Sequence, residues 1–281
     1  MNSYITSVKE ILSQQEISAV KELKRQEQQK VGLAYKLDLN FFSVTDGRAR
    51  HLLYWEGETL KGYMAISCYN LGGGEVEITM IMEQDRKIFE EMYQALLNFT
   101  EAQEIKLILF IVDKKDVFLK ECVAAAGAIH TFSEYSMTLE QDKFQPMESE
   151  VNLEKALPYE AVVIAGIEEA DPAKEVIPLD PEDLKKTKVY REDGQIIACI
   201  RIEKSMDDYG IYGFVVREGH RGKGLGRNIL SQVIQSILKE QPETIYLEVD
   251  TDNKPAHHLY RSLGFVETCQ FDYYERSVGR D

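Results

Sequence analysis

The sequence predicts two similar α+β domains in tandem. The order strand, strand, strand, helix, strand, helix, strand can be followed twice along its 281 residues, with a polar stretch that lacks periodicity in between. A chain of this length is long for one compact domain and suits two, because domains cluster near about 100–150 residues. We therefore expect domains at 1–140 and 155–281, joined by a linker at 141–154.

The first pass opens with a polar helix. Ser13 is followed three residues later by Glu16, which is the capping-box pattern of a helix that runs to about Lys30. Gly127 stands where a glycine commonly ends a helix. Apolar residues at strand or helix spacing place the other elements. The expected strands are 51–55, 59–69, 75–82, 105–112 and 133–139, and the expected helices are 86–101 and 116–126.

The second pass repeats this order. Asp193-Gly194 is a strong hairpin signal between two strands. Pro255 falls in the first turn of a helix, where its missing N–H costs nothing. The front of this pass differs from the first, because residues 150–187 are expected to hold only a strand, 160–167, and a short helix, 181–186. The remaining strands are 188–192, 195–204, 209–216, 244–250 and 265–274, and the helices are 224–239 and 255–263.

The net charge and the composition limit which binding partners and which cellular compartment are expected. Lys and Arg number 33 against 48 Asp and Glu, a net charge of −15. Nucleic acids and anionic membranes are bound through basic patches, so neither is expected as a partner. The sequence has no apolar run of the roughly 18–20 residues that a membrane span needs. Its N-terminus has no secretory pattern, and we expect a cytoplasmic protein.

Cysteines and histidines do not form a metal-binding pattern. The four cysteines are far apart with no CxxC pair, and the five histidines show no HExxH or similar motif. We expect reduced, mostly buried thiols and no metal site.

A glycine-rich turn between a strand and a helix is the strongest site signal. Three glycines at alternate positions leave the backbone N–H groups of this turn open, and the following helix adds partial positive charge. Three cations are interleaved with the glycines, which suits a phosphate group. The residues are Arg221, Gly222, Lys223, Gly224, Leu225, Gly226 and Arg227.

The spacing of this turn argues against nucleotide-binding motifs. A P-loop needs GxxxxGK followed by Ser or Thr, which 219–225 does not supply. A dinucleotide fingerprint needs GxGxxG, whereas this turn reads GxGxG and follows the third strand of an antiparallel meander. A nicotinamide dinucleotide is therefore disfavoured.

The turn resembles that of the GCN5-related N-acetyltransferase (GNAT) superfamily. The family's signature is Gln or Arg, two residues, Gly, one residue, then Gly or Ala, and 221–226 fits it. A second family element lies downstream, with Asn253, Pro255-Ala256, Leu259-Tyr260 and Leu263-Gly264-Phe265. The resemblance covers residues 188–275 closely. It implies that each domain is a mixed, mostly antiparallel twisted sheet flanked by helices.

The resemblance also implies a cosubstrate, acetyl-CoA, and the residues that bind it. The main chain of Phe214, Val215 and Val216 would bind the pantetheine arm, and the amides of 222–226 the pyrophosphate. Asn253 would contact the arm of the cofactor. Tyr260 matches the family's general acid, which protonates the departing thiolate.

The general base is assigned less directly. Tyr246, Glu248 and Asp250 share one face of a strand by the period of two. The run LEVD places Glu248 twelve residues before Tyr260, as in the bacterial ribosomal-protein N-terminal acetyltransferases, where that glutamate is the proposed base. The alternatives are a solvated or ion-paired Glu248, with a water relay or a hairpin acid as base. Those acids are Glu203, Asp207 and Asp208.

The first domain lacks these residues. Its equivalent turn, 83–87, reads EQDRK and has no glycine. Aligning Gly127 with Gly264 puts Val123 against Tyr260, Asp116 against Asn253 and Ile111 against Glu248. We therefore expect a degenerate domain without cofactor ligands, as occurs in other tandem members of the superfamily.

The sequence thus predicts an N-acetyltransferase that transfers acetyl directly from acetyl-CoA to a primary amine on a small molecule or a protein N-terminus. The alternatives are a non-catalytic acyl-CoA-binding or sensor module and, less favoured, a nucleotide-binding regulator. Coenzyme A and the amine acceptor are the expected partners. The chain is expected to be a monomer or a homodimer.

Overall fold

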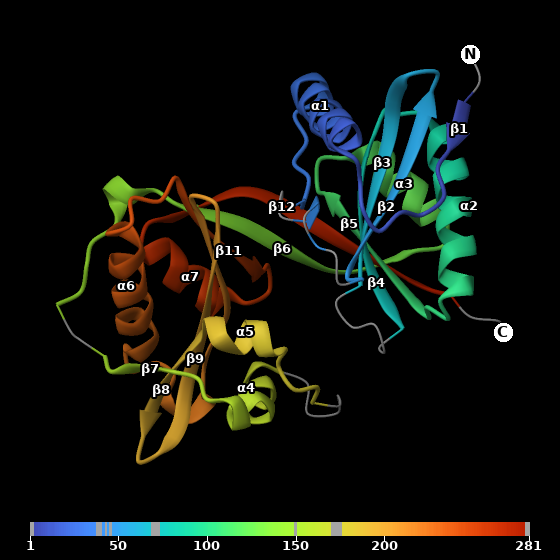
Figure 1. Ribbon diagram of the computed structural model, residues 1–281. Helices are drawn as coiled ribbons and strands as arrows, with labels where there is room; N and C mark the ends of the chain where they lie inside the picture. The colour runs from blue at the N-terminus through green and yellow to red at the C-terminus, as the bar shows by residue number, and fades with distance from the viewer. Residues whose placement is uncertain are drawn as a thin grey trace. The chain divides into compact units, whose positions relative to one another are not determined.

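The computed structural model describes residues 3–37, 41–42, 44, 47–68, 74–148, 151–169 and 176–278. The chain forms two compact units, each a sheet flanked by helices (Figure 1). The first unit comprises 1–134 and 269–281, and the second comprises 135–268. Tyr69, the predicted end of one strand, lies outside the described residues.

The sheet of the first unit has the strand order β1-β2-β3-β4-β5-β12. Neighbouring strands β1 to β4, and β5 with β12, pair antiparallel, whereas β4 and β5 are parallel. The strands are β1 Ser3–Ile5, β2 Ala49–Glu56, β3 Thr59–Ser67, β4 Glu75–Met82, β5 Leu107–Asp113 and β12 Phe265–Ser277. The helices are α1 Gln14–Val31, α2 Arg86–Ala102 and α3 Val117–Ala125.

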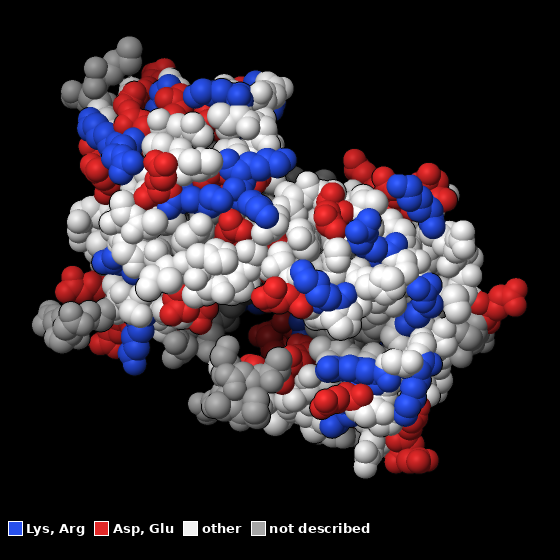
Figure 2. Space-filling model, turned by 180° about the vertical axis from the view of Figure 1, so that it is seen from behind, with Lys and Arg blue, Asp and Glu red and all other residues white. Residues whose placement is uncertain are grey.

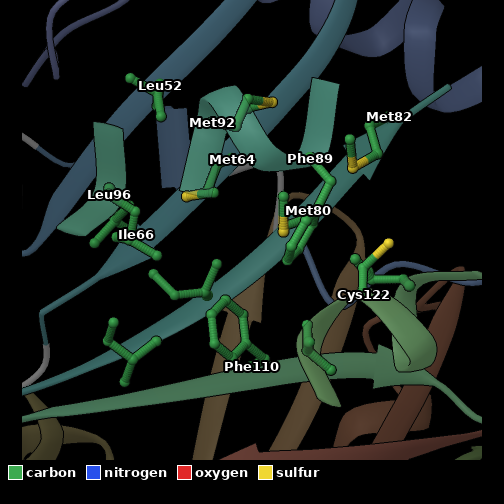
Figure 3. Packing of buried hydrophobic residues seen from close by; sticks show 14 of the residues in the cluster. Leu52, Met64, Ile66, Met80, Met82, Phe89, Met92, Leu96, Phe110 and Cys122 are labelled. Carbon is green, nitrogen blue, oxygen red and sulfur yellow. The ribbon is translucent and has the colours of Figure 1, made fainter. Parts of the chain in front are cut away.

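The two faces of this sheet bury separate clusters. One cluster, shown in Figure 3, joins side chains of β2 to β5, such as Met64 and Phe110, to Phe89 and Met92 of α2. The other places Val20 and Leu23 of α1 against Tyr63 and its neighbours. The predicted capping box of α1 is confirmed, since the side chain of Ser13 accepts from the N–H of Glu16, and that of Glu16 from the N–H of Ser13.

The second unit has the strand order β6-β11-β10-β9-β8-β7. Each of the strands β7 to β10 pairs antiparallel with the next one along the chain, whereas β10 and β11 pair in parallel. The strands are β6 Ile129–Leu139, β7 Leu153–Lys155, β8 Thr187–Glu192, β9 Gln195–Ser205, β10 Asp208–Val216 and β11 Thr244–Asp250. The helices are α4 Ala161–Glu168, α5 Pro181–Lys186, α6 Leu225–Leu238 and α7 Lys254–Ser262.

Helices cover both faces of this second sheet. On one face, α6 and α7 bury Ile229, Val233 and Leu263 against Ile211 and Leu247 of the central strands. On the other face, Ile164 of α4 and Leu184 of α5 pack against Val189, Ile196 and Cys199 of β8 and β9. The α+β architecture predicted for the two halves is confirmed.

One predicted strand is wrong. The predicted strand 160–167 is helical, with 161–167 in α4, although three β-branched residues, 162–164, follow one another there. The 3-10 turn Pro158–Glu160 starts the helix, and the Glu160 carboxylate accepts from the N–H of Leu157 at 2.7 Å. Ile164 and Ala165 are then buried, while Val162 and Val163 face solvent. Burial of one helical stripe thus overrides the strand preference of the residue types.

The units also have other bounds than the expected ranges 1–140 and 155–281, because each half of the sequence supplies a strand to the other unit. Residues 271–277 of β12 pair with β5 of the first unit and bury Phe271 and Tyr273 there. Residues 135–139 of β6 belong to the second unit, beside β11. The last two residues of the expected linker, 153 and 154, belong to β7, which pairs with β8.

Charged residues are mixed over the surface. On the face shown in Figure 2, acidic and basic side chains are interspersed. Among the residues described, no helix is both long and apolar enough to cross a membrane.

The exchanged strand leads to a stability prediction. Phe271 is 4% exposed and packs with Leu109 and Ile111 of β5. Phe271→Ala should destabilise the first unit by about 3–5 kcal/mol, the usual cost of removing a buried aromatic ring. Hydrogen exchange of the β5 amides should accelerate accordingly. Ile129→Ala is the control, because Ile129 is 73% exposed; unchanged β5 protection in Phe271→Ala would contradict the assignment of β12 to this unit.

Candidate functional site

The glycine-rich turn joins β10 to α6 through the short 3-10 turn Glu218–His220. Gly222 and Gly224 have φ of +74° and +84°, a conformation that other residues adopt at a cost. A Cβ built on either would meet no atom within 4 Å, so the space beside the turn is open. Glycine is therefore required here by the backbone conformation, and the open space can admit a ligand.

Gly226 has a different surrounding. A Cβ built there would lie 3.5 Å from Leu259 of α7 and 3.6 Å from Phe214 and Val216 of β10. The start of α6, the end of β10 and the middle of α7 therefore meet at this glycine. The structure thus brings the turn, residues 214–216 and the helix that carries Tyr260 together.

The side chains of three basic residues stabilise the turn by hydrogen bonds and place positive charge around it. The Nε of Arg221 donates to the carbonyl of Val216 at 2.7 Å, and the Nζ of Lys223 to the carbonyl of Gly219 at 3.0 Å. Arg227 donates to the hydroxyl of Ser262. Full charges and the first N–H groups of α6 therefore surround one small region, an arrangement that favours an anion.

Beside the turn, the parallel strands β10 and β11 stop pairing and diverge. We call this point of divergence the fork. Their parallel pairing runs from Asp208 with Thr244 to Ile211 with Leu247, and no further pair joins the described residues of these strands. A bulge then shifts the register of β10 against β9 between Tyr212 and Val215. The main chain of residues 214–216 is thus released from β11, as binding of an extended pantetheine arm would require.

A partly buried ion pair, which the sequence did not predict, lies next to this bulge. Gly213 has a φ of +53°, and a Cβ there would lie 2.4 Å from Oε1 of Glu168, at the end of α4. Nη2 of Arg201 donates to both oxygens of Glu168, at 2.9 and 3.0 Å. Burial raises the pKa of Glu168, and the charge of Arg201 opposes this rise. Glu168 follows directly after residues 160–167, for which the sequence predicts a strand and not a helix.

Tyr260 is held in the core of the second unit. Its side chain is 7% exposed and packs edge-to-face against Phe265, with ring centroids 6.1 Å apart. Burial raises the pKa of its phenol to about 12. The phenol therefore keeps its proton at neutral pH, as a general acid must.

Glu248 lies on the arm of the fork that β11 forms. Alternate residues of this strand, Ile245, Leu247 and Val249, are buried against α6 and α7. Tyr246, Glu248 and Asp250 are half-buried and point to the other face, which confirms the predicted alternation. Glu248 comes directly after the last paired residue of β11 and so lies where the strands begin to separate.

The other candidate bases lie farther along the sheet. Asp208 pairs with Thr244 at the closed end of the β10–β11 ladder, and Asp207 precedes it. Glu203 is opposite Gly210 in β9 and forms an ion pair with Lys186 at 2.6 Å. The position at the fork therefore favours Glu248.

Asn253 has a structural role in addition to any contact with a ligand. It caps α7, because its Oδ1 accepts from the N–H of Ala256 at 3.2 Å. A small cavity of about 220 Å³ lies on the outer side of the turn, lined by Glu192, His220, Lys223, Leu225 and Asn228. Within the part of the chain that the structure describes, no group of three or more His, Cys, Asp or Glu is placed to hold a metal ion.

The first unit has the same order of strands, helices and helix caps at the corresponding place, but it lacks the bulge and the glycine-rich turn. Asp116 caps α3 as Asn253 caps α7, accepting from the N–H of Leu119 at 2.9 Å. Gly127 and Gly264, which follow these helices, have φ of +85° and +98°. Yet the pairing of β3 with β4 shows no bulge, and Asp85 caps α2 directly after β4.

The region of the first unit that corresponds to the fork is packed with side chains. Met80 and Met82 follow the last parallel pair of β4 and β5, Thr79 with Ile111. Both are buried with Phe89 and Met92 of α2 (Figure 3). The end of β4 is thus packed against α2, directly before the turn at 83–85 that has no glycine.

Comparisons with known proteins agree with this geometry. The profile of the acetyltransferase (GNAT) family matches residues 157–265. The ribosomal protein bS18-alanine N-acetyltransferase of Escherichia coli (strain K12) is 32% identical over 91 residues, which are 32% of this chain and 62% of the relative. The chain thus spans less than two thirds of that relative's length.

Two solved structures share the fold over almost the whole chain. A GCN5-related N-acetyltransferase from Sphaerobacter thermophilus has a TM-score of 0.75 and 13% identity, and covers 99% of this chain and 96% of its own. A tandem GNAT protein from the clavulanic acid biosynthesis pathway has a TM-score of 0.73 and 13% identity, over 100% of both chains. Residues 157–265, most of the second unit, thus match the GNAT acetyltransferase family, and the whole chain shares its fold with these two structures.

Proposed function

We propose that the second unit is an acetyl-CoA-dependent N-acetyltransferase that acts on a primary amine. The observation that carries this proposal is the fork between β10 and β11 where it adjoins the open, cation-rich turn. The turn offers N–H groups of residues 222–226 to a pyrophosphate, and the released main chain of 214–216 offers hydrogen bonds to a pantetheine arm. The fork would then hold the thioester near Glu248.

The reaction needs one base, one acid and a donor to the carbonyl. An amine acceptor arrives as an ammonium ion, and Glu248 would take one proton from it. The free amine attacks the thioester carbon, the C–S bond breaks, and Tyr260 would protonate the coenzyme A thiolate. A backbone N–H near Val216 would stabilise the charge that develops on the carbonyl oxygen.

The acceptor is either a protein N-terminus or a small amine. The relative from Escherichia coli is named as an N-acetyltransferase of an alanine in ribosomal protein bS18, so a peptide that begins with alanine is the first substrate to test. The assay measures coenzyme A release with that peptide, free amino acids and polyamines. Tight acetyl-CoA binding without turnover of any amine would favour the alternative, a non-catalytic acyl-CoA-binding module.

We further propose that the first unit binds no acetyl-CoA. Its turn at 83–85 has no glycine, its β4 has no bulge, and Met80 and Met82 at the end of β4 are buried against α2.

The turn can be tested with two isosteric variants. Asn and Asp both tolerate positive φ better than most residues, so Gly224→Asn and Gly224→Asp carry similar backbone strain and differ in one charge. The aspartate would repel the pyrophosphate, and calorimetry should show acetyl-CoA affinity at least about tenfold below that of the asparagine variant. Wild type should bind one acetyl-CoA per chain. Equal affinity of the two variants would contradict the assignment of the turn, and two sites per chain would contradict an inactive first unit.

Tyr260→Phe removes the proposed acid and little else. We expect kcat to fall about 10²-fold or more, with acetyl-CoA affinity unchanged, because the hydroxyl acts on the leaving group. Since burial raises the pKa of Tyr260 to about 12, the wild type should lose no activity through this group until the pH approaches that value. An unchanged kcat would remove the tyrosine from the mechanism.

Glu248→Gln tests the base. The kcat/KM of the wild type should fall at acidic pH as the carboxylate becomes protonated, and this limb of the pH profile should disappear in the variant. Glu203→Gln is the matched control, because Glu203 is a carboxylate on the same sheet that is paired with Lys186. If the acidic limb persists in Glu248→Gln and disappears in Glu203→Gln, the base is Glu203.

A further inference from the structure

Two tyrosines meet at the base of the fork, and neither has a part in the mechanism above. Tyr212 is the last residue of β10 before the bulge, and Tyr246 precedes Leu247, the last paired residue of β11. The parallel register pairs Ile211 with Leu247, so the next residues on the two arms are Tyr212 and Glu248. The phenols and the carboxylate therefore lie next to each other along both arms.

All three side chains point to the same face of the sheet. Ile211 and Leu247 are buried against α6 and α7, so by strand alternation Tyr212, Tyr246 and Glu248 lie on the opposite face. Each of the three is half-buried, whereas Ile211, Leu247 and Val249 beside them in sequence are buried. The glycine-rich turn leads into α6, on the other face, so an acceptor that enters from the tyrosine face does not compete with the cofactor's pyrophosphate.

The two phenols hold each other in place. Their oxygens are 3.0 Å apart, and their rings pack edge-to-face with centroids 6.2 Å apart. One hydroxyl donates to the other, and a phenol oxygen accepts hydrogen bonds through two lone pairs. Burial, Tyr246 and the carboxylates of Glu248 and Glu203 all raise the pKa of Tyr212 well above its usual range. The phenol thus stays neutral while it sits in negative potential.

Such a set suits an ammonium group. Phenol oxygens accept hydrogen bonds from N–H donors, aromatic rings attract cations, and the nearby carboxylates add attraction. The ammonium would lie beside Glu248, the group to which it must lose a proton.

On these contacts, we propose that Tyr212 and Tyr246 form the acceptor-binding wall of the site and hold the ammonium group of the acceptor beside Glu248. This inference rests on the proposed acetyl transfer. It adds that the amine head is recognised by the tyrosine pair, whatever the rest of the acceptor is.

The test uses hydroxyl deletions that preserve ring packing. Tyr212→Phe and Tyr246→Phe are compared with wild type for an alanine-terminated peptide, or for the amine that the wild type turns over fastest. We expect kcat/KM for the acceptor to fall about tenfold or more in each variant, since hydrogen bonds to charged groups are strong. Acetyl-CoA affinity from calorimetry and the melting temperature should stay close to those of the wild type.

Tyr209→Phe is the matched control. Tyr209 is also in β10, but it lies on the opposite face, and its hydroxyl donates to the carboxylate of Glu240, two residues after α6. This variant should retain the wild-type kcat/KM. A second readout uses the deaminated peptide, with a propionyl group in place of alanine, as a competitive inhibitor. Its inhibition constant should be the same in wild type and both tyrosine variants, because it has no ammonium group for the phenols to hold.

The outcomes separate the two proposals. An unchanged acceptor kcat/KM in both variants, with active wild type, would overturn the acceptor wall and leave the proposed function intact. Equal weakening of the deaminated peptide would also overturn it, because the tyrosines would then act on shape and not on the ammonium. If wild type binds acetyl-CoA but acetylates no amine, the proposed function fails and the acceptor wall with it.

Discussion

The site of the second unit depends on one break in hydrogen bonding, where β10 leaves β11. A strand in a sheet has its N–H and C=O groups engaged on both sides, and a bulge is one way to release them locally. The bulge between Tyr212 and Val215 turns the main chain of β10 away from β11 while β9 stays paired. The open main chain, the neighbouring turn and the position of Glu248 at the fork all follow from this break.

At the centre of this break, the backbone conformation and the neighbouring side chain require a glycine. Gly213 has positive φ, and the carboxylate of Glu168 lies where a Cβ would be. Both side chains are partly buried, and their desolvation offsets part of their attraction, so the pair contributes more to defining geometry than to net stability. In this unit the pair ties the end of α4 to the bulge, and with it the side of the sheet that carries the two tyrosines.

Local patterns were sufficient to predict most of the elements and the turn. The capping box of α1, the hairpin at Asp193-Gly194 and the glycines of the turn are short-range signals, and the structure bears them out. The ion pair of Glu168 and Arg201 was not predicted, because its partners are 33 residues apart and α4 was interpreted as a strand. The face of Tyr246 and Glu248 followed from alternation alone, whereas the contact of Tyr246 with Tyr212 depends on which strands pair.

Strand exchange shows why strand partners are harder to predict than strands. The patterns of residues 133–139 and 265–274 predict strands correctly, but nothing in either segment says which unit it will complete. Residues 135–139 lie beside β11, the strand that carries Glu248, and they come from the half of the sequence that has no glycine-rich turn. The first unit in turn buries Phe271 and Tyr273 from the end of the chain. The half that lacks the site therefore still supplies part of the sheet on which the site is built, so loss of cofactor ligands in the first unit does not make that half dispensable.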